Sequence, residues 1–153
     1  LRTLAVGIIF ALVLSAGLSL FYPDLVLTTE LLSRTSVGID GLALALASGA
    51  AAALSITTGV SSVLVGVMVA VALLPPTVTL GICLGIGAYP EAKGAAFLLI
   101  ANIASVNLTA QLTMRLKGIK PREEEHQRTA LIVFIIGILC WCALIAYLIY
   151  RLN

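Results

Sequence analysis

Apolar and polar residues alternate along this 153-residue chain in long blocks, not with the short periods of a soluble amphipathic helix or strand. Five apolar blocks are separated by short polar stretches: 4–22, 39–55, 61–87, 94–114 and 129–150. A helix needs about 20 apolar residues to cross roughly 30 Å of hydrocarbon, and the blocks have about that length. The pattern predicts an all-α integral membrane protein, a bundle of about five transmembrane helices that occupies the whole of 1–153.

Charge is scarce and unevenly placed. Apolar residues make up 61% of the chain and charged residues only 10%, whereas a soluble domain carries about 25% charged residues. No charged residue occurs from 41 to 90. The net charge of +2, with no basic stripe interleaved with aromatics, excludes nucleic acid as a partner. The expected surroundings are a lipid bilayer.

The second apolar block is poor in large side chains. Gly41, Ala45, Gly49 and Ala53 recur at every fourth position, which places small residues along one face of a helix. Such a face lets helix backbones approach closely in lipid. We expect this helix to be packed inside the bundle.

The third block contains two adjacent prolines, Pro75 and Pro76, near its middle. Each proline lacks an amide donor, and its ring clashes with the preceding turn, so the span is predicted to be broken or strongly kinked there. Backbone groups freed in lipid are unfavourable by several kcal/mol each unless they are paired. A polar partner is therefore expected beside the prolines.

The fourth block supplies amides at a matching depth. With about 100° per residue, Asn102 shares one face with Ser105, Thr109 and Thr113, whereas Asn107 and Gln111 lie nearly opposite. One interpretation is a neutral pathway for a solute or ion, and its candidate residues are Pro75, Pro76, Thr77, Asn102, Asn107 and Gln111. The alternative is a structural kink paired by Thr77 and Thr79, with the amides as interhelical hydrogen bonds.

A second candidate site is the uncharged polar turn between the second and third blocks. It contains Thr57, Thr58, Gly59, Ser61 and Ser62. Thr58 is expected to cap the following helix, and unpaired amides at that helix start would suit an anion. Capping without any ligand is the simpler interpretation.

Charge also predicts the orientation. The loop 115–128 holds five Lys or Arg residues and is expected in the cytoplasm, so the chain is placed in the cell (inner) membrane as a multi-pass protein. Arg2 lies on the same side only if an even number of crossings separates it from this loop. The tyrosines then gather at the outer interface: Tyr22, Tyr89, Tyr147 and Tyr150.

Two stretches resemble one family. They are Ser-Ile-Thr-Thr-Gly-Val-Ser-Ser with the later Leu-Leu-Pro-Pro, within 49–76, and Ala-Asn through Asn-Leu, at 101–108, continuing to 116–119. Both are similar to the bacterial and archaeal membrane proteins catalogued as domain of unknown function 389, over about 1–121. The resemblance implies the second, C-terminal part of a membrane domain of six or so helices. It also implies an upstream helix or soluble region of the same protein, but it supplies no reaction or substrate.

Catalytic and metal motifs are missing from the sequence. It shows no Ser/His/Asp set, HExxH, P-loop or CxxC, and Cys83, Cys140 and Cys142 fit small core residues. We therefore expect no enzyme activity, no metal and no cofactor. Nor does the span 94–114 hold an ionisable residue of the kind that a proton-coupled pump uses.

The sequence leaves two functions open. The first is a transporter or channel-like domain for a small solute or ion. The alternative is a structural or regulatory membrane subunit without transport activity, which packs in a homo-oligomer or membrane complex.

Overall fold

The computed structural model describes residues 2–22, 25–59, 61–119, 131–132, 135–139 and 141–143. These residues form helices and connecting turns without any β-strand, which confirms the predicted all-α fold class. The helices are α1 (Arg2–Leu20), α2 (Thr29–Ser33), α3 (Ile39–Thr57), α4 (Ser62–Gly85) and α5 (Tyr89–Leu116). The described residues from 131 to 143 are also helical.

Four helices are long and apolar enough to cross a membrane: Thr3–Leu20, Ile39–Thr57, Val63–Gly85 and Tyr89–Leu116. They match the first four predicted spans and identify the chain as a helical membrane protein. The fourth begins earlier than the predicted 94 because Pro90 stands in its first turn, where a missing amide hydrogen loses no helical bond. Most of the fifth predicted span, 129–150, lies outside the described residues.

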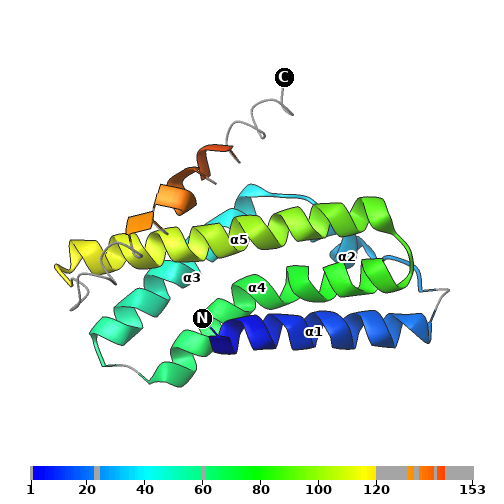
Figure 1. Cartoon of the computed structure of the whole chain (residues 1–153), viewed down its shortest axis with the longest axis horizontal. Helices are drawn as coiled ribbons and strands as arrows, with labels where there is room; N and C mark the ends of the chain where they lie inside the picture. The colour runs from blue at the N-terminus through cyan, green and yellow to red at the C-terminus, as the bar shows by residue number, and fades with distance from the viewer. Residues whose placement is uncertain are drawn as a thin grey trace.

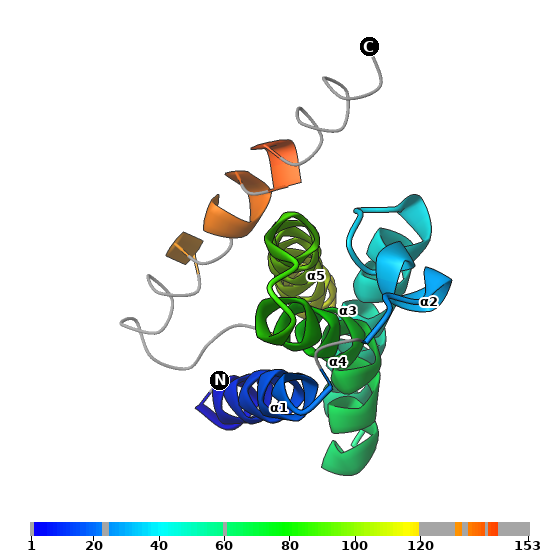
Figure 2. The same cartoon turned by 90° about the vertical axis from the view of Figure 1, so that its right-hand side faces the viewer.

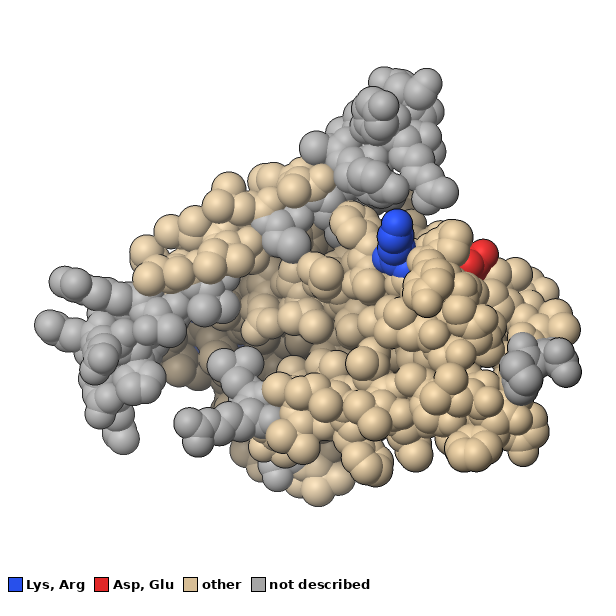
Figure 3. Space-filling view, turned by 45° about the vertical axis from the view of Figure 1, so that its right-hand side comes forward, with Lys and Arg blue, Asp and Glu red and all other residues tan. Residues whose placement is uncertain are grey.

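The surface agrees with a lipid environment. On the face shown in Figure 3, most of the described surface carries no Lys, Arg, Asp or Glu, and the charged side chains in view lie toward one end. Large apolar side chains such as Phe10 and Val13 of α1 are 67% and 63% exposed, as lipid-facing residues would be. Such exposure is unfavourable in water but matches hydrocarbon.

The spanning helices run alternately in opposite directions. In Figure 1 the start of α1, the turn between α3 and α4, and the end of α5 lie toward the left, while the end of α1 and the turn between α4 and α5 lie toward the right. α4 packs against α1, α3 and α5, and α3 also packs against α5; the end-on view in Figure 2 shows α4 next to all three. Because α4 crosses once and does not turn back, an even number of crossings separates Arg2 from the end of α5.

Small residues let α1 and α4 pack closely. A Cβ added to Gly81 would lie 2.7 Å from the Leu12 carbonyl oxygen, and one added to Gly85 would lie 2.6 Å from the Ala16 carbonyl oxygen. The hydroxyls of Ser15 and Ser19 fill the same places, so a side chain at either glycine would push the helices apart. We call these contacts the α1–α4 seam.

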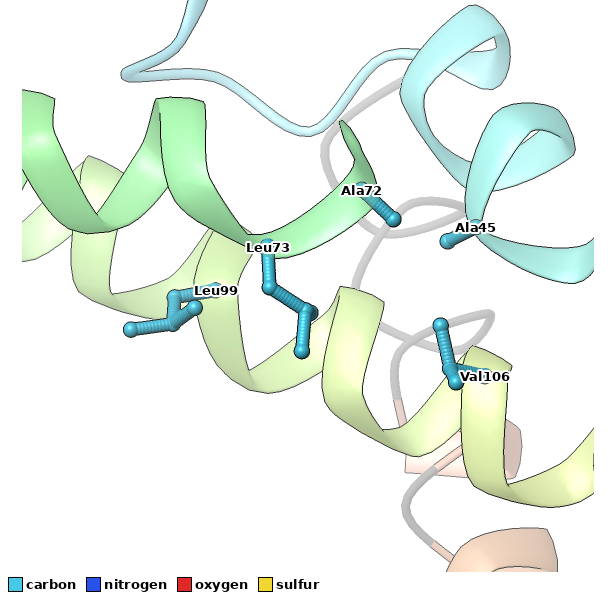
Figure 4. Close-up of a cluster of buried hydrophobic side chains, with 5 residues drawn as sticks. All are labelled: Ala45, Ala72, Leu73, Leu99 and Val106. Carbon is cyan, nitrogen blue, oxygen red and sulfur yellow. The ribbon is translucent and has the colours of Figure 1, made fainter. Parts of the chain in front are cut away.

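The predicted small-residue face of α3 packs mainly against α5. A Cβ on Gly49 would lie 2.8 Å from the Cα of Val106, and Ala45 and Ala53 have no exposed surface. Gly41 is looser, since its added Cβ would make only an ordinary contact of 3.7 Å. Between α3, α4 and α5 lies the buried apolar cluster in Figure 4: Ala45, Ala72, Leu73, Leu99 and Val106.

α4 continues through both prolines. It is helical from Ser62 to Gly85, so of the two predicted outcomes, a break or a strong kink, the break is wrong. The helix instead changes direction along its length, with its first part slanted relative to its second part in Figure 1. Each proline removes one backbone hydrogen bond, and a helix bends without ending when the remaining bonds hold and a neighbour pairs the freed group.

Candidate functional site

The carbonyl of Ala72 loses its helical donor because residue 76 is a proline. In a regular helix the amide of residue 76 would donate to the carbonyl of residue 72, and Pro76 has no amide hydrogen. Asn102 of α5 replaces it: its Nδ2 donates to the Ala72 carbonyl oxygen at 2.8 Å. Ala72 and Asn102 are 2% and 4% exposed, so this hydrogen bond is made away from solvent. It is the polar partner that the sequence predicted beside the prolines.

We define the proline junction as Pro75, Pro76 and Thr77 of α4 together with Asn102 of α5. Thr77 has no exposed surface, and its Oγ1 donates to the Leu73 carbonyl oxygen at 2.7 Å. The hydroxyl is therefore paired, but with a carbonyl that keeps its own helical donor. The predicted pairing of a proline-freed carbonyl comes from the amide on α5 instead.

One atom of the junction remains without a partner. Asn102 Oδ1 is buried and accepts no hydrogen bond from the described residues. The great majority of buried polar side-chain atoms have a partner in protein or ordered water. The junction thus holds an acceptor whose pairing is incomplete.

Asn107 and Gln111 are not gathered at the proline junction. Asn107 Nδ2 donates to the Ile103 carbonyl oxygen of its own helix at 3.0 Å. The side chains of Asn107 and Gln111 are both half-buried. Gln111 Oε1 is buried and lacks a partner among the described residues. Gln111 follows Asn102 by nine positions, which places it about 13 Å further along α5. The structure therefore divides the candidate pathway set into a junction and a separate amide pair, and a pathway role for either stays a prediction.

The other face of α5 connects it to three neighbours. Asn102 bonds to α4, and Thr109 lies against Gly49 of α3. Ser105 has no exposed surface, donates to the Ala101 carbonyl oxygen at 2.7 Å and accepts from Trp141 Nε1 at 3.1 Å. In the sequence, Ser105 falls on this face with no role of its own. Its periodicity could show the face, but not that Trp141 would reach it.

The Thr57–Ser62 turn serves the end of α3, not the start of α4. The hydroxyls of Thr57 and Thr58 both donate to the Leu54 carbonyl oxygen, at 2.8 and 2.9 Å. The prediction that Thr58 caps the next helix is therefore wrong, because Thr58 is the C-cap of α3 and its hydroxyl bonds backwards. Ser61 is the N-cap of α4 and makes no side-chain cap bond. Gly59, with φ of 74°, takes the left-handed conformation that ends a helix.

Ionisable residues that the structure describes lie toward helix ends. Asp40 and Glu91 stand in the first turns of α3 and α5, and Arg115 stands in the last turn of α5. Within the described part of the chain, no cluster of three or more His, Cys, Asp or Glu residues could hold a metal ion. The chemistry of the proline junction is therefore that of neutral amide, hydroxyl and carbonyl groups.

Comparison with known proteins agrees with the resemblance seen in the sequence. Residues 1–108 match the family model described as "Domain of unknown function (DUF389)", and the chain belongs to this family. It is also 29% identical, over 155 residues, to "Uncharacterized protein MJ0678" of Methanocaldococcus jannaschii. That alignment covers 99% of this chain and 48% of the relative, so the chain spans about half of the relative's length. No solved structure matches the chain.

Proposed function

We propose that this chain acts as a transport or channel-like membrane domain for a small solute or ion, with the proline junction beside the pathway. The observation that carries the proposal is the hydrogen bond from Asn102 to the carbonyl freed by Pro76, in a side chain whose oxygen has no partner among the described residues. Amides buried between spanning helices are costly unless they pair, so a half-paired amide is a candidate contact for a guest.

The depth of the junction favours the same function. Ala72 is the eleventh of the 24 residues of α4, and Asn102 is the fourteenth of the 28 residues of α5. Both therefore lie near the middle of a spanning helix. Secondary transporters bind substrates and ions near the bilayer midplane, where irregular helices expose backbone carbonyls. The proposal assigns no catalytic step to the chain, because the junction pairs no nucleophile with a base.

A structural or regulatory membrane subunit is the second candidate. It is favoured by the tight packing of the junction, where Thr77 has no exposed surface and its hydroxyl is bonded within α4. In this function Asn102 joins two helices, and the α1–α4 seam holds a third. The partners would be the remaining part of the same protein, a second copy, or other membrane subunits.

We further propose that the protein resides in the cell membrane with the loop 115–128 in the cytoplasm. The basic residues of that loop support this side, since cytoplasmic loops carry an excess of Lys and Arg. Tyr22 and Tyr89 both lie near the end of the bundle opposite to the end of α5, as expected for an outer interface.

Flux into liposomes that contain the intact protein tests the transport function. The panel is Na⁺, K⁺, Cl⁻ and small uncharged amides and polyols, each compared with protein-free vesicles. We expect uptake of at least one member above the background and a loss of that uptake in Asn102→Leu. Gly66→Ala, where an added Cβ meets nothing within 4 Å, should retain it. Asn107→Leu then tests whether the separate amide pair also lies beside the pathway. If every member of the panel behaves as in protein-free vesicles, transport is refuted. A stable hetero-complex isolated in mild detergent would then support the subunit function.

A further inference from the structure

The bend of α4 leaves backbone carbonyls that need new donors. Pro75 and Pro76 remove the helical donors of two carbonyls, those of Val71 and Ala72. Asn102 Nδ2 returns a donor to Ala72, and the single hydroxyl hydrogen of Thr77 goes to Leu73. Asn102 Oδ1 then adds a further acceptor, which has no partner among the described residues.

The amide of Asn102 cannot find a partner for Oδ1 by turning over. Rotating it by a half-turn would bring Oδ1 against the Ala72 carbonyl oxygen, so that two acceptors faced each other at the position of the present 2.8 Å bond. The bond to Ala72 therefore fixes which end of the amide points away. The side chain is also 4% exposed, so bulk water does not pair it.

Gln111, whose Oε1 also has no partner in the described part of the chain, is a weaker candidate. Its side chain is only half-buried and lies five residues before the end of α5 at Leu116. Among the described residues, no hydrogen bond fixes the direction of the Gln111 amide. Asn102 is held on one side, buried and close to the middle of its helix.

We propose that Asn102 Oδ1 binds a small electropositive guest at the proline junction: a monovalent cation, or a water molecule that donates a hydrogen bond. Both present positive charge density to an oxygen such as the unpartnered Asn102 Oδ1. This oxygen is neutral, and no acidic residue occurs from 41 to 90 or from 94 to 114. Protein sites for Ca²⁺ and Mg²⁺ usually include carboxylates, so a divalent cation fits poorly. The inference deepens the proposed function and rests on it only in placing this guest beside the pathway.

Thermal unfolding of the intact protein in detergent tests whether a cation is bound. The unfolding midpoint in NaCl or KCl is compared with that in N-methyl-D-glucamine chloride at equal ionic strength. A cation at about ten times its Kd should raise the unfolding midpoint by about 3–6 °C. We expect the shift to disappear in Asn102→Leu and to persist in Asn107→Leu. If Asn102→Leu does not fold, the same substitution is made together with Pro76→Ala, which restores an amide donor to the Ala72 carbonyl. The shift should then be present in Pro76→Ala and absent in the double variant.

A density map of the unsubstituted protein tests the water. A bound water gives no cation-dependent shift in any variant, but it gives an ordered peak about 2.7–3.2 Å from Asn102 Oδ1. The proposal is overturned if neither a cation shift nor a peak is found. It is equally overturned if the cation shift persists in Asn102→Leu, with or without Pro76→Ala. Neither measurement involves flux, so a failure of transport and a failure of this site are distinguishable.

Discussion

The hydrogen bond from Asn102 to Ala72 can be isolated by restoring the donor that Pro76 removes. Pro76→Ala gives residue 76 an amide hydrogen, which then donates to the Ala72 carbonyl within α4. In that background Asn102 is no longer the donor on which the carbonyl depends. Asn102→Leu should therefore destabilise the protein with Pro76 more than it destabilises the Pro76→Ala variant.

The expected difference is about 1 kcal/mol. Leaving a buried acceptor unpaired costs about 1–3 kcal/mol, whereas measured interhelical hydrogen bonds in a membrane protein average about 0.6 and reach about 1.7 kcal/mol. Asn102→Leu alone is a poor measure, because it also removes Oδ1, which no described residue pairs, and so regains part of that loss. A double-mutant cycle of Pro76→Ala and Asn102→Leu cancels this gain, because Oδ1 is removed both with and without Pro76. It also cancels the effect of the cavity left by the buried Pro76 ring, because that cavity forms both with and without Asn102.

Pro75→Ala is the matched control. It restores a donor to the Val71 carbonyl and leaves Ala72 dependent on Asn102, so its coupling to Asn102→Leu should be close to zero. Reversible unfolding of the four members of each cycle in mixed detergent micelles, followed by far-UV circular dichroism, gives both coupling energies. Equal coupling for Pro75 and Pro76, or none for Pro76, would refute the assignment of Asn102 as the replacement donor.

Three further predictions concern the packing and the direction of the helices. Gly81→Ala should destabilise the bundle by about 1–3 kcal/mol through overpacking of the α1–α4 seam. Its control is Gly66→Ala, where an added Cβ meets nothing within 4 Å, and this variant should be neutral or stabilising. Equal effects of the two substitutions in the same unfolding assay would contradict the close packing of the seam. Cys83, which has no exposed surface, should resist maleimide in a chain whose other cysteines are replaced by serine, and react once the protein is unfolded; labelling of the folded protein would show the site to be open. Cysteines placed at Ser61 and Lys93, at opposite ends of the bundle, should react with an impermeant reagent from opposite sides of a vesicle, and modification of both from one side would refute the single crossing of α4.

The helices were predictable because the hydrocarbon thickness sets both their length and their composition. That a polar group would pair a carbonyl freed by the prolines was predictable for a related reason, since such a carbonyl in lipid needs a donor at its own depth. The continuity of α4 was not predictable from the prolines themselves. Nor was the donor that replaces the one lost at Pro76, because Asn102 reaches Ala72 through the packing of two helices, and the two residues are 30 positions apart in the sequence.

The turn after α3 shows a different limit. A threonine hydroxyl both donates and accepts, so Thr58 is equally suited to close one helix or to open the next. The conformation of the backbone decides between them, and Gly59, with φ of 74°, ends α3 directly after Thr58. Sequence spacing could locate this turn but could not assign the direction of its hydrogen bonds.

The two parts of α4 on either side of the prolines are held differently, and this bears on both candidate functions. Beyond the prolines, Gly81 and Gly85 lock α4 to α1 at distances that leave no room for a side chain. Before them, Gly66 has open space around it.

The connection between the two parts lacks two backbone hydrogen bonds, and a single neutral bond from Asn102 replaces one of them. A change of about 1.4 kcal/mol alters a population tenfold, so a bond worth about 1 kcal/mol would alter an equilibrium between two bends of α4 about fivefold. A guest at Asn102 Oδ1 would act on the same amide and hence on the same bend. A subunit that only packs against partners has no use for that sensitivity, and this is why the transport function is the one to test first.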